Sequence, residues 1–457
     1  MRYLSFLRIG VLVLATLLAS CGASDNEETA YWVRAVNVVK DSPRQTLNVN
    51  QLPVRNLVDY LNATPYAVPI SDGTSPNIVP VDIVANTPNG TPITVAGIQE
   101  YEFLGGHEYT FITAGTLADP RLYVTSNARR KKPVVGGYLE VVHVAMNQGP
   151  LDVYLTEPGV DLTGVTPFAT LSLSETSGSL QFTQGTYQLR VTAAGSSTVI
   201  FDSGDLNLTV DAEWQWILVD SLASGGPVLR VIASAGGTGT LIDDLAMQAS
   251  VRALSIDVTK GPIDVFAGVD NTPIALALDY AGLSTYTDFP RGDLDFLVTL
   301  AGDPSSILLD ITDPVDAGTK YTSVLGTAGS ILTRVLVPDD TRSVATSAKI
   351  RFVQGINIPG YINVYMTAEI PAVPPTGFTN AVVLSQVYGG ISLMGNKEPG
   401  EYYVSVVTRP NTESGGETFL LDPMLMQLNG GEVTTFLISQ VSATDTTPTL
   451  RVINETP

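Results

Sequence analysis

The sequence predicts an all-β protein of four tandem Ig-like antiparallel β-sandwich domains behind a lipoprotein signal peptide. Three observations predict it: the composition, strands with alternating apolar residues, and three landmarks that recur four times in the same order. Charged residues make up only 15% of the 457 residues, and 41 glycines and 29 prolines can supply turns. This balance is too apolar for a disordered chain, and short strands joined by turns fit it better than long solvated helices.

The first residues have the organisation of an export signal. The stretch "MRYLSFLR" carries two arginines and no acid, and the apolar run "IGVLVLATLL" after it is too short to span a bilayer comfortably. The run ends in Leu18, Ala19, Ser20 and Cys21, which resembles the bacterial lipobox. We therefore expect residues 1–20 to be a lipoprotein signal peptide. The alternative is that Cys21 is a small buried core residue.

Cys21 is the only cysteine, and we expect it to carry the acyl chains that hold the protein to the membrane. Residues 21–29 would then form a short acidic tether. Gly22 follows the cysteine, where proteins retained in the inner membrane have Asp, so we expect a lipid anchor in the outer membrane, facing the periplasm or the surface. With no second cysteine, the fold cannot use disulfides.

The protein is strongly acidic. Its net charge is −21 and becomes −23 when residues 1–20, with their two arginines, are removed. A surface of this sign repels nucleic acid, so we expect no nucleic-acid partner. Acidic turns at residues 241–245, 268–273 and 338–341 could bind Ca²⁺, although none has EF-hand spacing; otherwise these acids are solvated. No other cofactor or metal site is expected.

The clearest internal repeat is a short strand, "GPLDVYL" at residues 149–155 and "GPIDVFA" at residues 261–267. Weaker copies occur in the first and last quarters of the chain. An Asn or Asp anchors each copy, with spacings of 104, 112 and 99 residues: Asn48, Asp152, Asp264 and Asn363. We expect these anchors to bond a neighbouring turn or strand, the alternative being a functional role.

Two further landmarks follow each anchor in the same order. The first is a glycine turn that opens into a strand, at Gly106, Gly185, Gly292 and Gly400; the second is a closing strand, "RLYV", "PVLRVI", "ILTRVL" and "PTLRVI". Each unit of about a hundred residues is large enough for a β-sandwich with its own core. The predicted domains are 30–127 (diverged, with an insertion), 134–235, 248–339 and 347–457.

The alternation within the repeated strand predicts which side chains are buried. In "PLDVYL" we expect Leu151, Val153 and Leu155 to face the core and Tyr154 to face outward, as does Tyr365 in the last copy. Trp214 and Trp216 lie two residues apart and so share a strand face. Two interpretations stay open for these aromatic residues, packing in a core and a sugar-stacking platform.

At this point the chain resembles a known bacterial family. The openings "VVHVAMNQGPLDVYL" and "VRALSIDVTKGPIDVFA", each followed by a Gly-Thr-Tyr-like strand, are similar to the family catalogued as DUF4397. Its members typically show "V-H-x-S-P-D-A-P-x-V-D-V-Y" and a later "L-P-A-G-T-Y-x-V-x-V". Residues 145–148 depart from this pattern, and the third copy lacks the His. The resemblance covers about residues 134–340 and implies the fold and export, not a reaction.

The sequence offers little catalytic chemistry. The two histidines, His107 and His143, lack the neighbours of a hydrolase triad or a zinc site, so we expect His143 to be structural and His107 to be exposed at a turn. The basic cluster "ARRKK" at residues 128–132 is interpreted as a solvated hinge, the alternatives being contact with lipopolysaccharide phosphates or a protease site.

We therefore expect a non-enzymatic adhesion, interaction or structural scaffold protein with an unknown protein or glycan partner. Extended, four such domains would reach about 150 Å. One alternative is a glycan- or small-ligand-binding module, in which Tyr154, Trp214, Trp216 and Tyr365 would cluster in one open groove. A second alternative is a carboxylate-based hydrolase.

Overall fold

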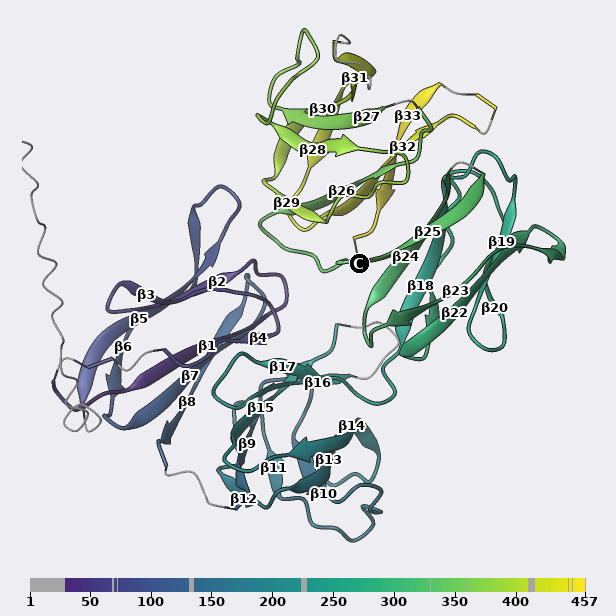
Figure 1. The fold of residues 1–457 in the computed structure, drawn as a ribbon. Helices are drawn as coiled ribbons and strands as arrows, with labels where there is room; N and C mark the ends of the chain where they lie inside the picture. The colour runs from purple at the N-terminus through teal and green to yellow at the C-terminus, as the bar shows by residue number, and fades with distance from the viewer. Residues whose placement is uncertain are drawn as a thin grey trace, which may run out of the picture.

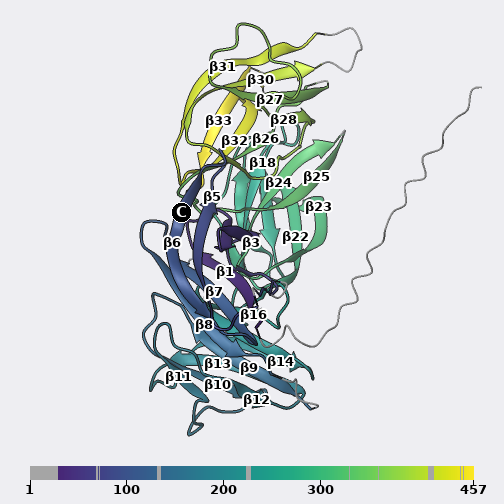
Figure 2. The same ribbon diagram turned by 90° about the vertical axis from the view of Figure 1, so that its left-hand side faces the viewer.

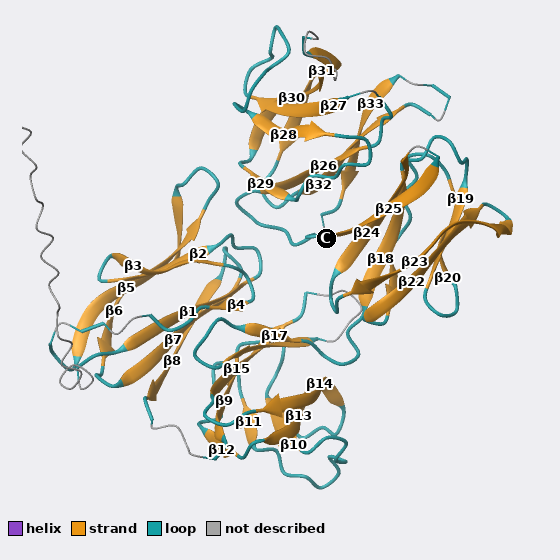
Figure 3. Ribbon diagram, in the orientation of Figure 1, coloured by secondary structure: helices purple, strands orange, loops and turns teal. Residues whose placement is uncertain are grey.

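The computed structural model describes residues 29–67, 70–71, 73–130, 135–222, 228–328, 330–358, 360–409, 416–442, 444–445 and 447–456. This part of the chain folds into 33 β-strands and contains no helix (Figures 1 and 3). The all-β fold class is thus confirmed. The signal peptide, the lipobox residues Leu18, Ala19 and Ser20, Cys21 and most of the tether lie outside the described residues.

The strands fall into four groups, which we call sandwiches 1 to 4. Sandwich 1 contains β1 (Trp32–Val39), β2 (Gln45–Val49), β3 (Leu52–Val58), β4 (Asn62–Ala63), β5 (Asn77–Asn86), β6 (Pro92–Phe103), β7 (His107–Gly115) and β8 (Pro120–Ala128). Sandwich 2 contains β9 (Gly137–His143), β10 (Leu151–Thr156), β11 (Ala169–Leu171), β12 (Leu180–Phe182), β13 (Gly185–Ala193), β14 (Val199–Leu208), β15 (Glu213–Asp220), β16 (Leu229–Ser234) and β17 (Thr240–Ile242). Sandwich 3 contains β18 (Ala249–Ser255), β19 (Ile263–Ala267), β20 (Thr272–Leu278), β21 (Thr287–Phe289), β22 (Gly292–Leu300), β23 (Asp303–Val315), β24 (Lys320–Ala328) and β25 (Ile331–Pro338). Sandwich 4 contains β26 (Ala348–Gln354), β27 (Tyr361–Thr367), β28 (Ala381–Gln386), β29 (Gly395–Lys397), β30 (Gly400–Arg409), β31 (Thr418–Leu428), β32 (Val433–Gln440) and β33 (Pro448–Asn454).

All four sandwiches have the same strand order. If the strands of each are numbered from its own start, one sheet has the order 4-1-7-8 and the other 3-2-5-6, with β17 added to the first sheet of sandwich 2. We call them sheet A and sheet B. The first and seventh strands pair in parallel, for example β1 with β7 through Arg34 and Thr110, whereas sheet B is antiparallel throughout. Sheet A is therefore mixed, a detail that the predicted antiparallel sandwich lacked.

The core of each sandwich lies between its two sheets. In sandwich 2 it combines Val141 of sheet A with Leu151 and Val153 of sheet B around the fully buried Trp216. In sandwich 1 the rings of Tyr31 and Phe103 are stacked at 4.2 Å. The inward direction predicted for Leu151 and Val153 is confirmed.

Sheet A is also covered on its outer face, because the sandwiches pack in pairs through this sheet. Ten buried apolar residues join sandwich 1 to sandwich 2: Val36, Val38, Ala63, Ile112, Ala114, Val142, Val144, Ile217, Val219 and Ile232. Six join sandwich 3 to sandwich 4: Leu254, Ile256, Val324, Val353, Leu437 and Ile453. The four domains therefore do not form an extended row of separate units, since each sheet A needs a neighbour to bury its second apolar face.

The two pairs also contact each other. The segment between sandwiches 3 and 4 lies on the loop after β1, where Arg342 Nη1 donates to the carbonyl oxygens of Lys40 and Ser42 at 3.2 and 2.9 Å. The amide of Ala345 donates to the carbonyl of Asp41 at 2.9 Å. Sandwich 1 thus touches the C-terminal half of the chain, and sandwiches 4 and 2 lie at opposite ends of the molecule (Figures 1 and 2).

Candidate functional site

The repeated anchor residues hold turns in sheet B of each sandwich. Asp264 accepts the amides of Ala277 at 2.7 Å and Gly302 at 2.9 Å, and Asn363 accepts the amide of Ser385 at 2.8 Å. Ala277 and Ser385 have φ values of 50° and 54°, so each marks a bulge whose amide is unavailable to the regular ladder.

The other two anchors bond in related ways. Asp152 accepts the hydroxyl of Thr170 at 2.5 Å and the amide of Gly195 at 2.7 Å, and Asn48 donates to Asp82 at 2.8 Å. The four anchors lie in four separate sandwiches, so the fold does not bring them together in one site.

Tyr154 and Tyr365 point to the outer face of sheet B, as predicted, but they are covered there and do not face solvent. Tyr154 is 7% exposed and lies opposite Arg190 in the neighbouring strand. The Nη2 of Arg190 donates to the hydroxyl of Thr156 at 2.8 Å, on the same face of the sheet as Tyr154. Tyr365 is fully buried, and its hydroxyl bonds the carbonyl of Gly377 in the loop between β27 and β28 at 3.2 Å. Alternation predicts the sheet face correctly but not what covers it.

The two tryptophans of β15 share the inner face of their strand, as their spacing predicts. Trp216 lies in the core of sandwich 2, and Trp214 packs half-buried at its margin. Trp214 also borders a cleft between sandwiches 1 and 2, and it is the one predicted aromatic residue that reaches a cleft described in this part of the chain. The four aromatic residues therefore share no groove.

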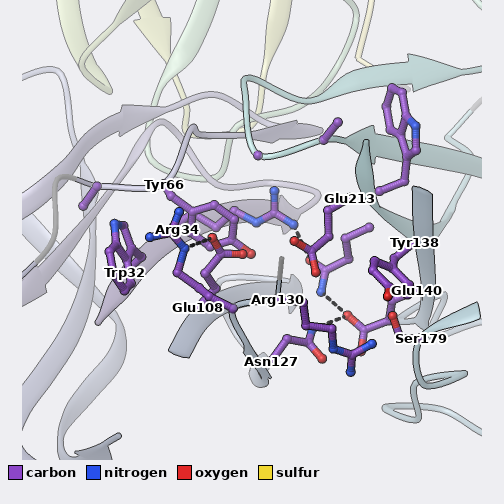
Figure 4. A pocket seen from close by; sticks show the side chains of 16 residues that line it. Trp32, Arg34, Tyr66, Glu108, Asn127, Arg130, Tyr138, Glu140, Ser179 and Glu213 are labelled. Carbon is purple, nitrogen blue, oxygen red and sulfur yellow. Dashed lines mark hydrogen bonds and ion pairs between the residues drawn. The ribbon is translucent and has the colours of Figure 1, made fainter. Parts of the chain in front are cut away.

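The cleft has a volume of about 410 Å³ and is lined by residues of both sandwiches 1 and 2. Figure 4 shows Trp32, Arg34, Tyr66 and Glu108 on its sandwich 1 side, with Tyr138, Glu140 and Glu213 on the side of sandwich 2. Three arginines and three glutamates line it: Arg34, Arg129, Arg130, Glu108, Glu140 and Glu213. Among the described residues, the cleft thus combines aromatic and polar walls with equal numbers of arginines and glutamates.

A buried polar chain forms the floor of the cleft. Arg34 is 1% exposed and donates from Nε to Thr110 at 2.9 Å, from Nη1 to Ser234 at 2.7 Å and from Nη2 to Gln215 at 2.7 Å. Gln215 in turn donates from Nε2 to Glu140 Oε2 at 2.7 Å. The side-chain amide of Gln215 thereby links the guanidinium of Arg34 in sandwich 1 to the carboxylate of Glu140 in sandwich 2.

Arginines cover two aromatic rings at the mouth of the cleft. The guanidinium of Arg129 lies 4.0 Å from the centre of the Trp32 ring and pairs with Glu108 at 3.3 Å, and Arg130 lies 5.3 Å from the Tyr138 ring. Such stacking holds a cation against a ring face. Arg129 and Arg130 are exposed, as the interpretation of "ARRKK" as solvated expects, but each also lies over an aromatic ring; Lys131 and Lys132 lie outside the described residues.

Sandwiches 3 and 4 meet around a fully charged centre. Arg351 pairs with Asp339 at 2.6 Å and with Glu455 at 3.1 Å, and Arg252 pairs with Glu455 at 2.5 Å and with Asp339 at 3.6 Å. Burial alone would raise the pKa of Glu455, but Arg252 and Arg351 outweigh it and hold that pKa below its usual value. The turn containing Asp339, proposed as solvated or calcium-binding, is thus part of an internal ion cluster.

Sequence reasoning missed both centres. Their arginines stand in the first strand of a sandwich, in "VRAV", "VRAL" and "IRFV", and Glu140 stands at the same place in "LEVV". A charge that recurs inside an otherwise apolar strand was the available signal, because such strands are usually buried on both faces and a buried charge needs a partner.

His143 is structural, as expected. Its Nε2 bonds the carbonyl of Gly149 at 3.1 Å, and its Nδ1 accepts the amide of Ala145 at 3.3 Å. Burial lowers the pKa of His143. Across the described ranges, no group of three or more His, Cys, Asp or Glu residues is placed to hold a metal, and no helix there is long and apolar enough to cross a membrane.

Comparisons with solved structures give only weak likenesses. The TIE protein of Bacillus anthracis is 10% identical with a TM-score of 0.16; the match covers 86% of this chain, which spans 65% of that protein. A CBM26 module from Eubacterium rectale Amy13K, solved with maltoheptaose, is 12% identical with a TM-score of 0.14; the match covers 46% of this chain and 98% of the module. Among curated proteins, none matches.

The family comparison is more specific. Residues 249–365 match the family described as "Domain of unknown function (DUF4397)". The matched segment begins with β18, contains all of sandwich 3 and ends within β27. It includes the stretch "GPIDVFA", on which the resemblance to this family rested, so the match supports that family for this part of the chain.

Proposed function

We propose that the protein is a lipid-anchored, non-enzymatic scaffold of the cell envelope that presents rigidly paired β-sandwiches to a protein or glycan partner. The observation that carries the proposal is the packing of the sandwiches in pairs through sheet A. A buried apolar contact with a bonded polar centre fixes the angle between two domains, whereas a linker alone leaves them free to move. Fixed geometry is what a scaffold or adhesion body requires.

The burial of the repeated aromatic residues supports this role over a stacking platform for sugars. Tyr154, Trp216 and Tyr365 stabilise cores or cover sheets, and only Trp214 reaches a cleft. The recurring acids likewise bond backbone amides in turns. The residues that the repeat preserves therefore serve the architecture. The hydrolase alternative has no such support, since Glu140 and Glu108 are both held by side chains of the interface.

The anchor rests on the sequence. The apolar segment, the lipobox and the lone Cys21 together support acylation, and the net charge of the remaining chain argues against electrostatic attachment to anionic lipids. The outer membrane, on its periplasmic or outer face, is the proposed location.

The test is expression of the whole chain and of its Cys21→Ser variant in a Gram-negative host grown with labelled palmitate. We expect label and outer-membrane fractionation for the first and a soluble, unlabelled protein for the second. Membrane attachment that survives Cys21→Ser contradicts the anchor. The residues from 22 onward, assayed against chromogenic glycosides and esters, should show no turnover; turnover would contradict the non-enzymatic role.

A further inference from the structure

The two sandwich pairs have one arginine at a matching position. Arg34 on β1 and Arg252 on β18 both donate from Nε to the threonine opposite them on the seventh strand, each at 2.9 Å. Each guanidinium also lies against a tyrosine ring, Arg34 at 4.5 Å from Tyr66 and Arg252 at 4.6 Å from Tyr286. The two positions are therefore directly comparable.

The residues that complete the centre differ. In the second pair, Asp339 and Glu455 follow the eighth strands and bring two carboxylates to Arg252. The backbone of Asp339 bonds Lys320, two residues before Thr322. In sandwich 1, the residue two positions before Thr110 is Glu108, and the residue opposite it on β8 is Asn127. Asn127 therefore corresponds to Asp339. The side-chain amide of Asn127 thus stands where the second pair has the carboxylate of Asp339.

The place of Glu455 is taken by a glycine. The amide of Glu455 bonds the carbonyl of Val433, which lies two residues before Thr435 in β32. In sandwich 2, Gln215 of β15 is opposite Ser234. The residue that corresponds to Glu455, two positions beyond Ser234, is therefore Gly236. Gly236 lines the cleft, and a Cβ added there would meet only Tyr66 Cδ2, at 3.9 Å. The first pair therefore has open space where the second has a buried glutamate.

The polar floor of this space has unused hydrogen-bonding capacity. The bonds of Arg34 use three of its five N–H groups, one on each nitrogen. Both bonds to Glu140 end on Oε2, from Asn127 at 2.8 Å and Gln215 at 2.7 Å, which leaves Oε1 as an acceptor. Donors and an acceptor thus stand on either side of Gln215.

This pattern selects a ligand class. A carboxylate at the place of Glu455 would meet Arg34 but also Glu140, because sandwich 2 has Glu140 where sandwich 4 has Arg351. A pair of neighbouring hydroxyls suits both groups, since one oxygen accepts from Arg34 while the other hydroxyl donates to Glu140. The three arginines and three glutamates among the described residues of the cleft favour a ligand without net charge.

We propose that the cleft between sandwiches 1 and 2 is a binding site for a neutral saccharide, with neighbouring hydroxyls bonded to Arg34 and Glu140. Its volume of about 410 Å³ accommodates a mono- or disaccharide. This goes beyond the scaffold role and does not depend on the membrane anchor.

The test is saturation-transfer NMR on the protein from residue 22 onward with maltose, cellobiose and lactose, and with glutamate and glycine as a charged arm. Ser179→Trp blocks the mouth of the cleft from an exposed position, and Ser197→Trp, exposed on a distant loop of the same sandwich, is its matched control. Glu140→Gln keeps the size of the side chain while turning an N–H₂ towards the cleft.

We expect at least one disaccharide to bind, with affinity lost in Ser179→Trp, unchanged in Ser197→Trp and at least about tenfold weaker in Glu140→Gln. Native near-ultraviolet circular dichroism of each variant shows that the fold is kept. Binding of glutamate or glycine in place of the sugars would overturn the ligand class. Sugar binding that Ser179→Trp leaves intact, or no binding at about 10 mM of any disaccharide, would overturn the site.

Discussion

At the scale of the residue, the repeated acids act as clamps on turns. Asp152 and Asp264 each join their strand to two other segments through charge-assisted bonds, which are roughly twice as strong as neutral ones. The sequence predicted such bonds because an acid recurring in a strand commonly bonds nearby backbone. It could not predict the partners, since those lie 13 to 43 residues away.

Replacement of Asp152 by alanine should destabilise sandwich 2 by about 2–4 kcal/mol, because the amide of Gly195 and the hydroxyl of Thr170 lose a buried acceptor. Trp214 and Trp216 lie in this sandwich, so urea unfolding followed by tryptophan fluorescence measures the loss. Glu157→Ala, at an exposed position beyond the same strand, should change the midpoint little. Equal effects of the two substitutions would contradict the clamp.

His143 should make sandwich 2 less stable in mild acid. Burial lowers the pKa of His143 in the folded state, so below its usual 6.5 the unfolded chain binds a proton more readily than the folded one. Protonation of Nδ1 would also remove the acceptor of the Ala145 amide. Stability should therefore fall as the pH drops through 6.5 towards the lowered folded-state pKa, and change little above about 7.5.

The measurement is the urea midpoint by tryptophan fluorescence across this pH range. His143→Asn should make the urea midpoint depend less on pH. His107→Asn, in sandwich 1, should leave the pH dependence of the midpoint unchanged. A wild-type midpoint that does not fall as the pH drops below 6.5 contradicts the role given to His143.

At the scale of the element, the strands of sheet A explain both a success and a failure of prediction. The period of two placed Trp214 and Trp216 on one face and predicted the cores. The first strands, however, are apolar on both faces, as in "WVRAVNVV", a pattern of strands with no solvent side. Reading them as half-buried missed the second contact, because periodicity reveals that a face is apolar and not which surface covers it.

Ile217→Ala in β15 should cost nearly as much as Leu218→Ala, about 2–5 kcal/mol each, although the two side chains point to opposite faces. Leu218 fills the core of sandwich 2, and Ile217 is equally buried against sandwich 1. Val199→Ala, on an exposed part of β14, is the control and should cost far less. A cost for Ile217→Ala as small as for Val199→Ala would show that the outer face of sheet A is free.

At the scale of the whole molecule, the four sandwiches form two packed pairs rather than four separate domains. The repeated landmarks predicted four sandwiches, but the pairing depends on contacts between residues about a hundred or two hundred positions apart, such as Arg252 with Glu455. The acidic turn at residues 338–341 is predicted to be solvated or calcium-binding, and burial between sandwiches 3 and 4 reverses that interpretation for Asp339.

Glu455→Ala should destabilise the second pair by about 3–5 kcal/mol, because Arg252 and Arg351 would lose a buried carboxylate. The folded-state pKa of Glu455 is lowered, so its contribution is present above its usual value of 4.5 and is lost as the pH falls through the folded-state pKa. Chemical unfolding followed by circular dichroism measures the change. Glu401→Ala, at an exposed position of β30, is the control.

The pairing is tested most directly by hydrogen exchange on the whole chain carrying Val353→Asp. Val353 lies on the outer face of β26 in sandwich 4 and packs against residues of sandwich 3. Because a buried aspartate there opens the contact between the sheets A, amide exchange should accelerate in β18 and β24 as well as in β26. Faster exchange confined to sandwich 4, with β18 and β24 as protected as before, would contradict the paired architecture.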